Sequence, residues 1–370
     1  MKVSPRFVNA NKTDFYRVLT QRVDSYFSEN KLSKNANATM VIKTLVMLSI
    51  YFVPYAFILS GTLSLYGMWL CCVIMGLGFA GIGMAVMHDA NHGAYTASHF
   101  WNKIIGYSLN VIGGDADNWK VQHNKLHHVY TNIHGFDLDI RENAGLRFTP
   151  EVKHKPFQRF QILYVFVLYA LQTFFWVFIK DFMQFSRFSK SGADGQDTKA
   201  RAIHFGIMLF SKIVCVFYTL VLPMLLLDIT WWQLLVGFMT MHFVGGFTLA
   251  VVFQLAHVIE EIKFPVPDEK GQIANEWAIH QMQTTANFAP RNKWLSYYVG
   301  GLNYQIEHHL FMRICHIHYP QIAPIVQQTA MEFGIPYIQH ATLSKAFVSH
   351  VALMNKLGRN EVLSQALEIG

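Results

Sequence analysis

The segment LYGMWLCCVIMGLGFAGIGMAVMHDANH, from Leu65 to His92, carries the most structural information in this chain. It is uncharged from Leu65 to Met87, and at about 1.5 Å per helical residue it can cross a hydrocarbon core of about 30 Å. The run ends at His88 and His92, whose spacing places both imidazoles on one helix face. The segment therefore predicts a membrane-spanning helix with a pair of metal ligands at one end.

The composition agrees with a membrane environment. Of the 370 residues, 52% are hydrophobic and 14% are charged, whereas soluble domains carry about 25% charged residues. Such a surface requires lipid around it, which indicates an integral membrane protein. The net charge of +7 is explained by Lys and Arg on the cytoplasmic side of the membrane, so we expect no nucleic-acid partner.

Four apolar runs predict an all-α fold with four transmembrane helices in two hairpins. The first hairpin joins Thr44–Ser60 to Leu65–Met87, and the second joins Ile203–Leu227 to Trp231–His257. Glycines such as Gly76 allow close packing between these helices. The expected remainder is a set of interfacial helices and a cytoplasmic helical cap that carries the histidines.

A fifth run, Phe160–Ile179, is also long enough to span the membrane, but Lys and Arg flank it on both sides. Positive charge at both ends indicates that both ends are cytoplasmic, so we expect an interfacial or re-entrant helix. The N-terminus, the C-terminus and the metal site then lie on the cytoplasmic side. We expect one domain, 1–370, whose consecutive segments are 1–43, 44–87 (first hairpin), 88–202 (two histidine clusters), 203–257 (second hairpin) and 258–370 (cap).

Histidines are concentrated in three clusters, HDANH, HNKLHH and QIEHH, and one further histidine ends the fourth predicted helix. The candidate ligands are His88, His92, His123, His127, His128, His257, His308 and His309. Spacings of four recur in the first two clusters, and Gln305 stands four residues before His309. Three such groups at one membrane surface supply enough ligands for two metal ions.

The chemistry of these ligands favours a redox metal. Imidazole suits Fe, Zn, Cu and Ni, but structural zinc sites are usually rich in Cys, which the clusters lack. Iron with mainly nitrogen ligands can activate oxygen for the removal of hydrogen from an unactivated C–H bond. We expect nearby carboxylates to hold the ring N–H groups of the ligands, and the candidates are Asp89, Asp137, Asp139 and Glu307.

At these residues the chain resembles the membrane fatty acid desaturase family. The three clusters in order form its signature, and GGLNYQIEHHLF (Gly300–Phe311) and EWAIHQMQTTANF (Glu276–Phe288) are similar to its front-end branch. That branch, which includes linoleoyl-CoA desaturase-like enzymes of the Δ5, Δ6 and Δ8 types, inserts double bonds between an existing one and the carboxyl end. The resemblance implies an oxygen-dependent oxidoreductase that introduces a cis double bond into a fatty acyl chain.

The resemblance also implies a cofactor and partners. A non-haem di-iron centre would be held by the cluster histidines and His257, for which His280 is the competitor, and Gln305 would bind iron directly or through water. The partners would be molecular oxygen, an acyl-CoA or acyl-lipid substrate, membrane lipids, and an external ferredoxin-like or cytochrome b5-like electron donor. Asn118 and Trp119 would line the acyl tunnel.

Two other classes of function remain open from the sequence. The first is a di-iron fatty acyl or lipid hydroxylase, because the same metal site can insert oxygen instead of removing a second hydrogen. The second is a non-enzymatic membrane protein that binds metal or haem. The clustering of histidines at one face argues against a transporter, whose polar groups would lie deep inside the spans.

Overall fold

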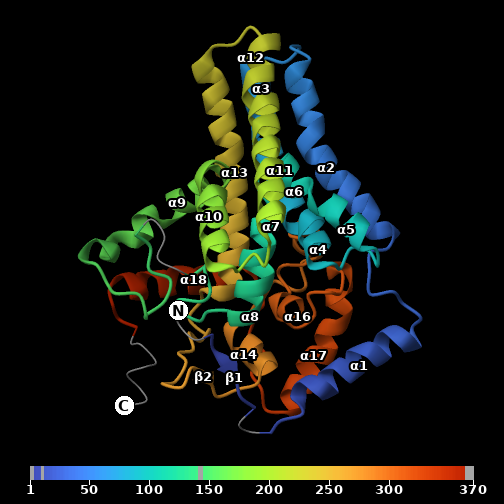
Figure 1. Cartoon of the computed structure of the whole chain (residues 1–370), viewed down its shortest axis with the longest axis vertical. Helices are drawn as coiled ribbons and strands as arrows, with labels where there is room; N and C mark the ends of the chain where they lie inside the picture. Colours follow the sequence, from blue (N-terminus) through green and yellow to red (C-terminus); the bar gives the residue numbers. More distant parts are fainter. Residues whose placement is uncertain (1–3, 10–11, 141–144, 363–370) are drawn as a thin grey trace. The chain divides into compact units, whose positions relative to one another are not determined.

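The computed structural model describes residues 4–9, 12–140 and 145–362 (Figure 1). The chain divides into two compact units. Unit 1 comprises Met1–Asn35, Gln122–Val165 and Val252–Gly370, and unit 2 comprises Ala36–Val121 and Phe166–Val251. The secondary structure is almost entirely helical, as the sequence predicts.

The first hairpin of unit 2 is formed by α2 (Ala38–Leu59) and α3 (Leu65–Gly81). Each helix begins at a side-chain cap, because Asn37 accepts from the amide of Met40 and Ser64 accepts from that of Gly67. The second helix continues through the π-helical turn η1 (Ile82–Val86) into α4 (Met87–His92). It stops at Gly93, whose φ of 75° ends the helix in the left-handed conformation.

Glycines bring the helices of unit 2 into close contact. A Cβ atom on Gly78 would lie 2.6 Å from the backbone nitrogen of Tyr51 in α2. A Cβ atom on Gly76 would lie 2.7 Å from the carbonyl oxygen of Met241 in α13 (Trp231–His257). Both approaches require glycine, which confirms the packing role that the sequence predicts for Gly76.

Two further long helical stretches also contain π-helical turns. One runs from η3 (Pro156–Phe160) through α9 (Gln161–Phe175) and η4 (Trp176–Lys180) to α10 (Asp181–Ser191). The next runs through α11 (Thr198–Val216), η5 (Phe217–Val221) and α12 (Leu222–Leu226) and precedes α13. Short helices α5 (His99–Gly106), α6 (Ser108–Val111) and α7 (Ala116–Lys120) complete unit 2.

Five helical stretches are long and apolar enough to cross a membrane, which agrees with an integral membrane protein. They are Ala38–Leu59, Leu65–His92, Pro156–Ser191, Thr198–Leu226 and Trp231–His257. The third of these contains the run that the sequence predicts to be interfacial or re-entrant, and it is one uninterrupted helical stretch. The topology with four crossings therefore stays a prediction.

Unit 1 has its own hydrophobic core. Helix α1 (Phe15–Glu29) buries Phe15, Leu19, Val23 and Phe27, which recur every four residues along one face. This face packs with α14 (Trp277–Thr284), α16 (Gln305–Leu310) and α17 (Tyr319–Glu332). The third histidine cluster thus lies on a short helix that the core holds in place.

Smaller elements complete unit 1. They are η2 (Val121–His127), which begins one residue before the unit, α8 (His128–Tyr130), α15 (Lys293–Tyr298), η6 (His316–His318) and α18 (Leu343–Gly358). Strand β1 (Arg6–Phe7) pairs in parallel with β2 (Gln272–Ile273), and β3 (Asn287–Phe288) pairs in parallel with β4 (Gln339–His340).

Candidate metal centre

The first histidine cluster lies on α4 in unit 2. His88 and His92 are both buried, and their ring centroids are 4.6 Å apart. The indole of Trp119 contacts both rings edge-on, at centroid distances of 5.5 and 5.4 Å. A carboxylate oxygen of Asp89 lies 3.9 Å from His88 Nδ1. Trp119 therefore forms part of the immediate surroundings of this pair.

Asn118 makes different contacts from its neighbour Trp119. Its side-chain amide donates to the carbonyl oxygen of Asp181 at 3.0 Å. Its backbone amide donates to Asp115, which caps the start of α7. Asn118 therefore connects α7, the helix that carries Trp119, to the start of α10.

The second cluster lies at the start of the Gln122–Val165 segment of unit 1, where the helix η2 is π-helical. His123 and His127 belong to η2, and His128 follows it. The Nε2 atoms of His123 and His128 are 3.2 Å apart, and the rings of His123 and His127 stack at 5.2 Å. A π-helix has more residues per turn than an α-helix, so it brings together side chains four and five residues apart. All three imidazoles consequently face the same region.

His127, His257 and His309 come from separate parts of the sequence and converge within unit 1. Their centroid distances are 4.7 Å (His127 to His257), 5.0 Å (His127 to His309) and 4.8 Å (His257 to His309). Each offers one ligand nitrogen, and these nitrogens lie within 4.8 Å of one another. Nitrogens that share a metal at about 2.1 Å each are separated by at most about 4.2 Å, so this triad needs little adjustment to bind an ion.

The hydrogen bonds of this triad leave one nitrogen of each ring available. The Nδ1 atom of His127 pairs with Asp137 at 3.0 Å, that of His257 with the carbonyl oxygen of Thr284 at 3.2 Å, and that of His309 with Gln281 at 2.8 Å. All three Nε2 atoms are buried and make no hydrogen bond. Buried imidazole nitrogens without partners, on rings held through Nδ1, are the arrangement that metal-binding histidines show. The residues therefore fit a metal ion.

A second group shares one member with the triad. His128, His308 and His309 also offer ligand nitrogens within 4.8 Å of one another. The Nδ1 atom of His308 lies 3.2 Å from the hydroxyl oxygen of Tyr319, which orients its ring. Two groups that share His309 provide enough nitrogen ligands in unit 1 for more than one metal ion.

The electrostatics around the triad differ between its members. Burial alone would raise the pKa of Asp137, but His127 and the backbone amides of Asp139 and Asn132 lower it below its usual value. Asp137 thus stays ionised and makes His127 a more basic ligand. Burial, followed by the neighbouring histidines, holds the pKa of His309 well below its usual value. His309 is therefore neutral, which is the form that binds metal.

The other predicted polar residues take different positions. Asp139 accepts from the side chain of Gln122, and its second oxygen lies 3.6 Å from His127 Nδ1. Glu307 accepts from Asn287 at 2.7 Å and from Tyr337 at 2.8 Å, so its carboxylate is bound to the scaffold, and burial raises its pKa to about 7.

Gln305 and His280 differ in their relation to the histidine groups. The side chain of Gln305 lies beside that of His257, although its buried Oε1 makes no well-directed hydrogen bond. His280 is buried against the ring of Phe7, at a centroid distance of 5.0 Å, and burial lowers its pKa to about 4. Among the described residues, the groups that could hold a metal include His257 and do not include His280.

Gln281 is a residue of this site that sequence reasoning missed. Its carbonyl oxygen pairs with His309 Nδ1 and accepts from the hydroxyl of Thr131 at 2.9 Å, while its amide donates to the carbonyl oxygen of His128 at 3.1 Å. One side chain therefore connects the second and third clusters. Its only signal in the sequence is its place in EWAIHQMQTTANF, the stretch that is similar to the front-end branch.

Comparisons with known proteins find matches over most of this chain. The family model described as fatty acid desaturase matches residues 63–341. The sn-1 linoleoyl-lipid 6-desaturase of Synechocystis is 34% identical over 360 residues, covering 97% of this chain and 99% of the relative. An acyl-lipid (8-3)-desaturase of Physcomitrium patens is 34% identical over 367 residues, covering 97% of this chain and 75% of the relative. The sn-1 linoleoyl-lipid 6-desaturase of Arthrospira platensis is 34% identical over 346 residues, covering 94% of this chain and 93% of the relative.

A match over most of the chain, together with buried histidines that fit a metal, excludes a chance likeness of short motifs. The chain belongs to the fatty acid desaturase family.

Proposed function

We propose that this protein introduces a cis double bond into an acyl chain of a membrane glycerolipid, on the carboxyl side of an existing double bond. Three relatives that are similar to this chain over most of its length are named for linoleoyl-lipid or acyl-lipid substrates, which supports a lipid rather than a CoA head group. The observation that carries the proposal is the triad of buried, unpartnered Nε2 atoms on His127, His257 and His309.

In this proposal a pair of iron ions is held by eight histidines. They are His88, His92, His123, His127, His128, His257, His308 and His309. The iron pair would supply the activation of molecular oxygen that removes two hydrogens from an unactivated C–C unit and releases water. Two electrons per turnover would come from an external ferredoxin-like or cytochrome b5-like protein.

The protein's own residues would keep the ligand rings in one orientation. Asp137 and Gln281 hold the Nδ1 sides of His127 and His309, so both rings direct Nε2 to the shared region. The histidines of the triad are at most 1% exposed, which excludes bulk water from the oxidation. In unit 2, the indole of Trp119 beside His88 and His92 would form an apolar wall for the acyl chain.

We also propose four membrane crossings, with the termini and the histidines on the cytoplasmic side. His127 and His309 belong to one group, yet three candidate spans lie between them in the sequence. An odd number of crossings would separate them, so an even number is required. The Lys and Arg residues around Phe160–Ile179 favour this run as the one that does not cross.

The membrane topology can be tested by labelling single introduced cysteines with a membrane-impermeant maleimide, in a variant without the native cysteines. Thr62→Cys, in the first hairpin turn, is expected to react in intact cells. Ser191→Cys, at the last residue of Pro156–Ser191, is expected to react only after permeabilisation. Labelling of Ser191→Cys in intact cells would contradict the proposed topology.

The activity can be tested by profiling fatty acid methyl esters from cells that express the protein with an electron donor and are fed saturated and unsaturated acids. The wild type is expected to give a product with one more double bond on the carboxyl side of an existing one. His309→Ala is expected to abolish it, whereas His99→Ala, which alters an exposed histidine, is expected to retain it. A product heavier by one oxygen would identify a hydroxylase instead, and the absence of any new product would refute the proposal.

A further inference from the structure

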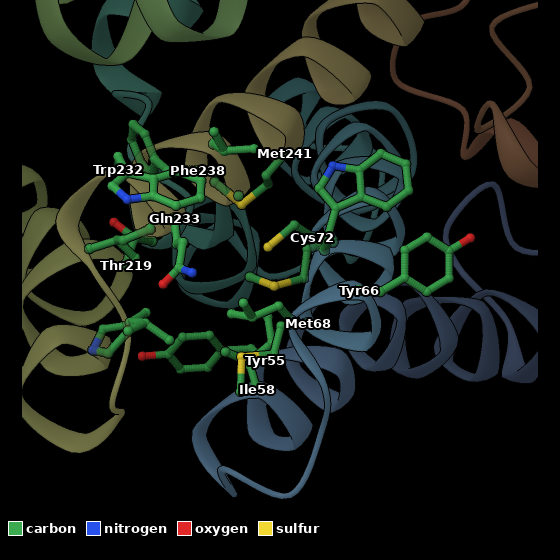
Figure 2. A pocket seen from close by; sticks show the side chains of 18 residues that line it. Tyr55, Ile58, Tyr66, Met68, Cys72, Thr219, Trp232, Gln233, Phe238 and Met241 are labelled. Atoms are coloured by element: carbon green, nitrogen blue, oxygen red, sulfur yellow. The ribbon is translucent and has the colours of Figure 1, made fainter.

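Unit 2 contains an apolar groove at the turn end of both hairpins, whereas His88 and His92 lie at the opposite end of the second candidate span. It has a volume of about 300 Å³, which is at the lower end for ligand pockets (Figure 2). Its walls come from the end of α2, the first part of α3, the middle residue of η5, the second residue of α12 and the first part of α13. Trp69 of its wall and His88 lie on one continuous helical stretch, about 28 Å apart at 1.5 Å per residue.

The interior of the groove suits a hydrocarbon chain. None of the residues that line it is Asp, Glu, Lys, Arg or His. Figure 2 shows Met68 and Cys72 on the wall from α3, and Phe238 and Met241 on the wall from α13. Methionine side chains are flexible and polarisable, so such walls adapt to an alkyl chain.

The polar groups inside the groove already have protein partners. Trp69 Nε1 donates to the hydroxyl of Thr240 at 3.1 Å. The hydroxyl of Thr219 donates to the carbonyl oxygen of Cys215 at 2.6 Å, and the hydroxyl of Tyr55 donates to a backbone carbonyl oxygen. A polar ligand would therefore lose its hydrogen bonds with solvent without replacement, which disfavours it.

The rim of the groove, unlike its interior, offers a hydrogen-bond donor. Gln233 lies in the first turn of α13, and its carbonyl oxygen accepts from the backbone amide of Thr230 at 2.8 Å, which leaves its amide group to act as a donor. Tyr66 and Trp232, in the first turns of α3 and α13, are 68% and 53% exposed. Tyrosine and tryptophan at helix ends are typical of the membrane interface, where the ester groups of lipids lie.

We infer that this groove binds one acyl chain of a membrane glycerolipid that is not the substrate, with the ester carbonyl at the Gln233 rim. The candidate spans that line the groove place hydrocarbon around it, so the chain of a neighbouring lipid is the apolar ligand present at highest concentration. Residues of both hairpins of unit 2 line the groove, so a bound acyl chain would contact both hairpins. The site takes a neutral ester and not an anionic group, because no cationic side chain lines it.

The groove can be tested with the full-length protein in nanodiscs of phosphatidylcholine that carries a diazirine near the end of one acyl chain. After irradiation, peptide mapping is expected to find cross-links concentrated on residues 65–75 and 232–241. Gly237→Leu should reduce these cross-links at least fivefold, because a Cβ atom there already lies 3.0 Å from Cys72 Sγ. Gly206→Leu is the matched control, since a Cβ atom there meets nothing within 4 Å.

A rim variant and an activity assay complete the test. Gln233→Leu changes only the rim and is expected to reduce labelling several-fold, so it replaces Gly237→Leu if that variant fails to fold. Desaturase activity of the folded variants is expected to stay at the wild-type level, which separates this site from the substrate site. Cross-links spread evenly over the lipid-facing helices would refute the site, and labelling by a photoactivatable sterol or free fatty acid but not by phosphatidylcholine would refute the glycerolipid.

Discussion

Replacement of Lys212 by Met should strongly destabilise the protein. The Lys212 ammonium lies 2.8 Å from a carboxylate oxygen of Asp181 and donates to the carbonyl oxygens of Gly113 at 2.9 Å and Val177 at 2.7 Å. Its three protons are thus all used, and the side chains of both ionic partners are at most 7% exposed. In the sequence, Lys212 interrupts an apolar run, where it could either extend to the membrane interface or face protein, and in the structure it faces protein.

The magnitude follows from the geometry of the pair. At 2.8 Å and an effective dielectric constant of about 20, the Coulomb attraction is about 6 kcal/mol. Desolvation offsets part of this, so the pair itself contributes less. Removal of one partner leaves the other charge buried and unpaired, and we expect Lys212→Met to lower the free energy of unfolding by about 3–5 kcal/mol. Asp181→Asn should cost a similar amount.

The assay is a double-mutant cycle in detergent, with thermal and chemical unfolding followed for the four proteins. The double variant Lys212→Met/Asp181→Asn should recover most of the loss, because neither charge remains. Lys199→Met, which alters an exposed lysine on the same helix, is the control and should change stability by less than about 0.5 kcal/mol. A double variant no more stable than Lys212→Met would refute the reasoning.

Three further predictions concern unit 1. Gln281→Ala should lower iron affinity by about 10- to 100-fold, because the His309 ring loses the side chain that orients it. The measurement is the iron content per protein after dialysis against a chelator, and the control Gln283→Ala, on the same helix, should retain iron. Complete removal of iron should lower the melting temperature and re-addition should restore it, because a bound ion stabilises the folded state; an unchanged melting temperature would contradict a structural contribution. Burial lowers the pKa of His350 to about 4 from near 6.5 in the unfolded chain, so the free energy of unfolding should fall by about 3 kcal/mol as the pH drops from 6.5 to 4. In chemical unfolding, the free energy of unfolding of His350→Gln should depend less on pH than that of the wild type.

The apolar runs and the histidine spacings predict part of the fold and of the candidate site from the sequence alone. Leu65–His92 predicts both a spanning helix and the metal-facing pair at its end, because hydropathy and periodicity act within one segment. Gly76 could be predicted as a contact residue for the same reason, since a small side chain permits close approach whatever its partner is.

Tertiary structure decided which distant residues share a candidate ligand group. The sequence alone determined that imidazoles gather near the ends of apolar helices, and it favoured His257 over its competitor His280 only because His257 ends an apolar run. The fold brings His257 to His127 and His309, and it recruits Gln281 through hydrogen bonds that no spacing encodes. The physical reason is that periodicity describes one helix at a time, whereas a ligand group depends on where several helices end in space.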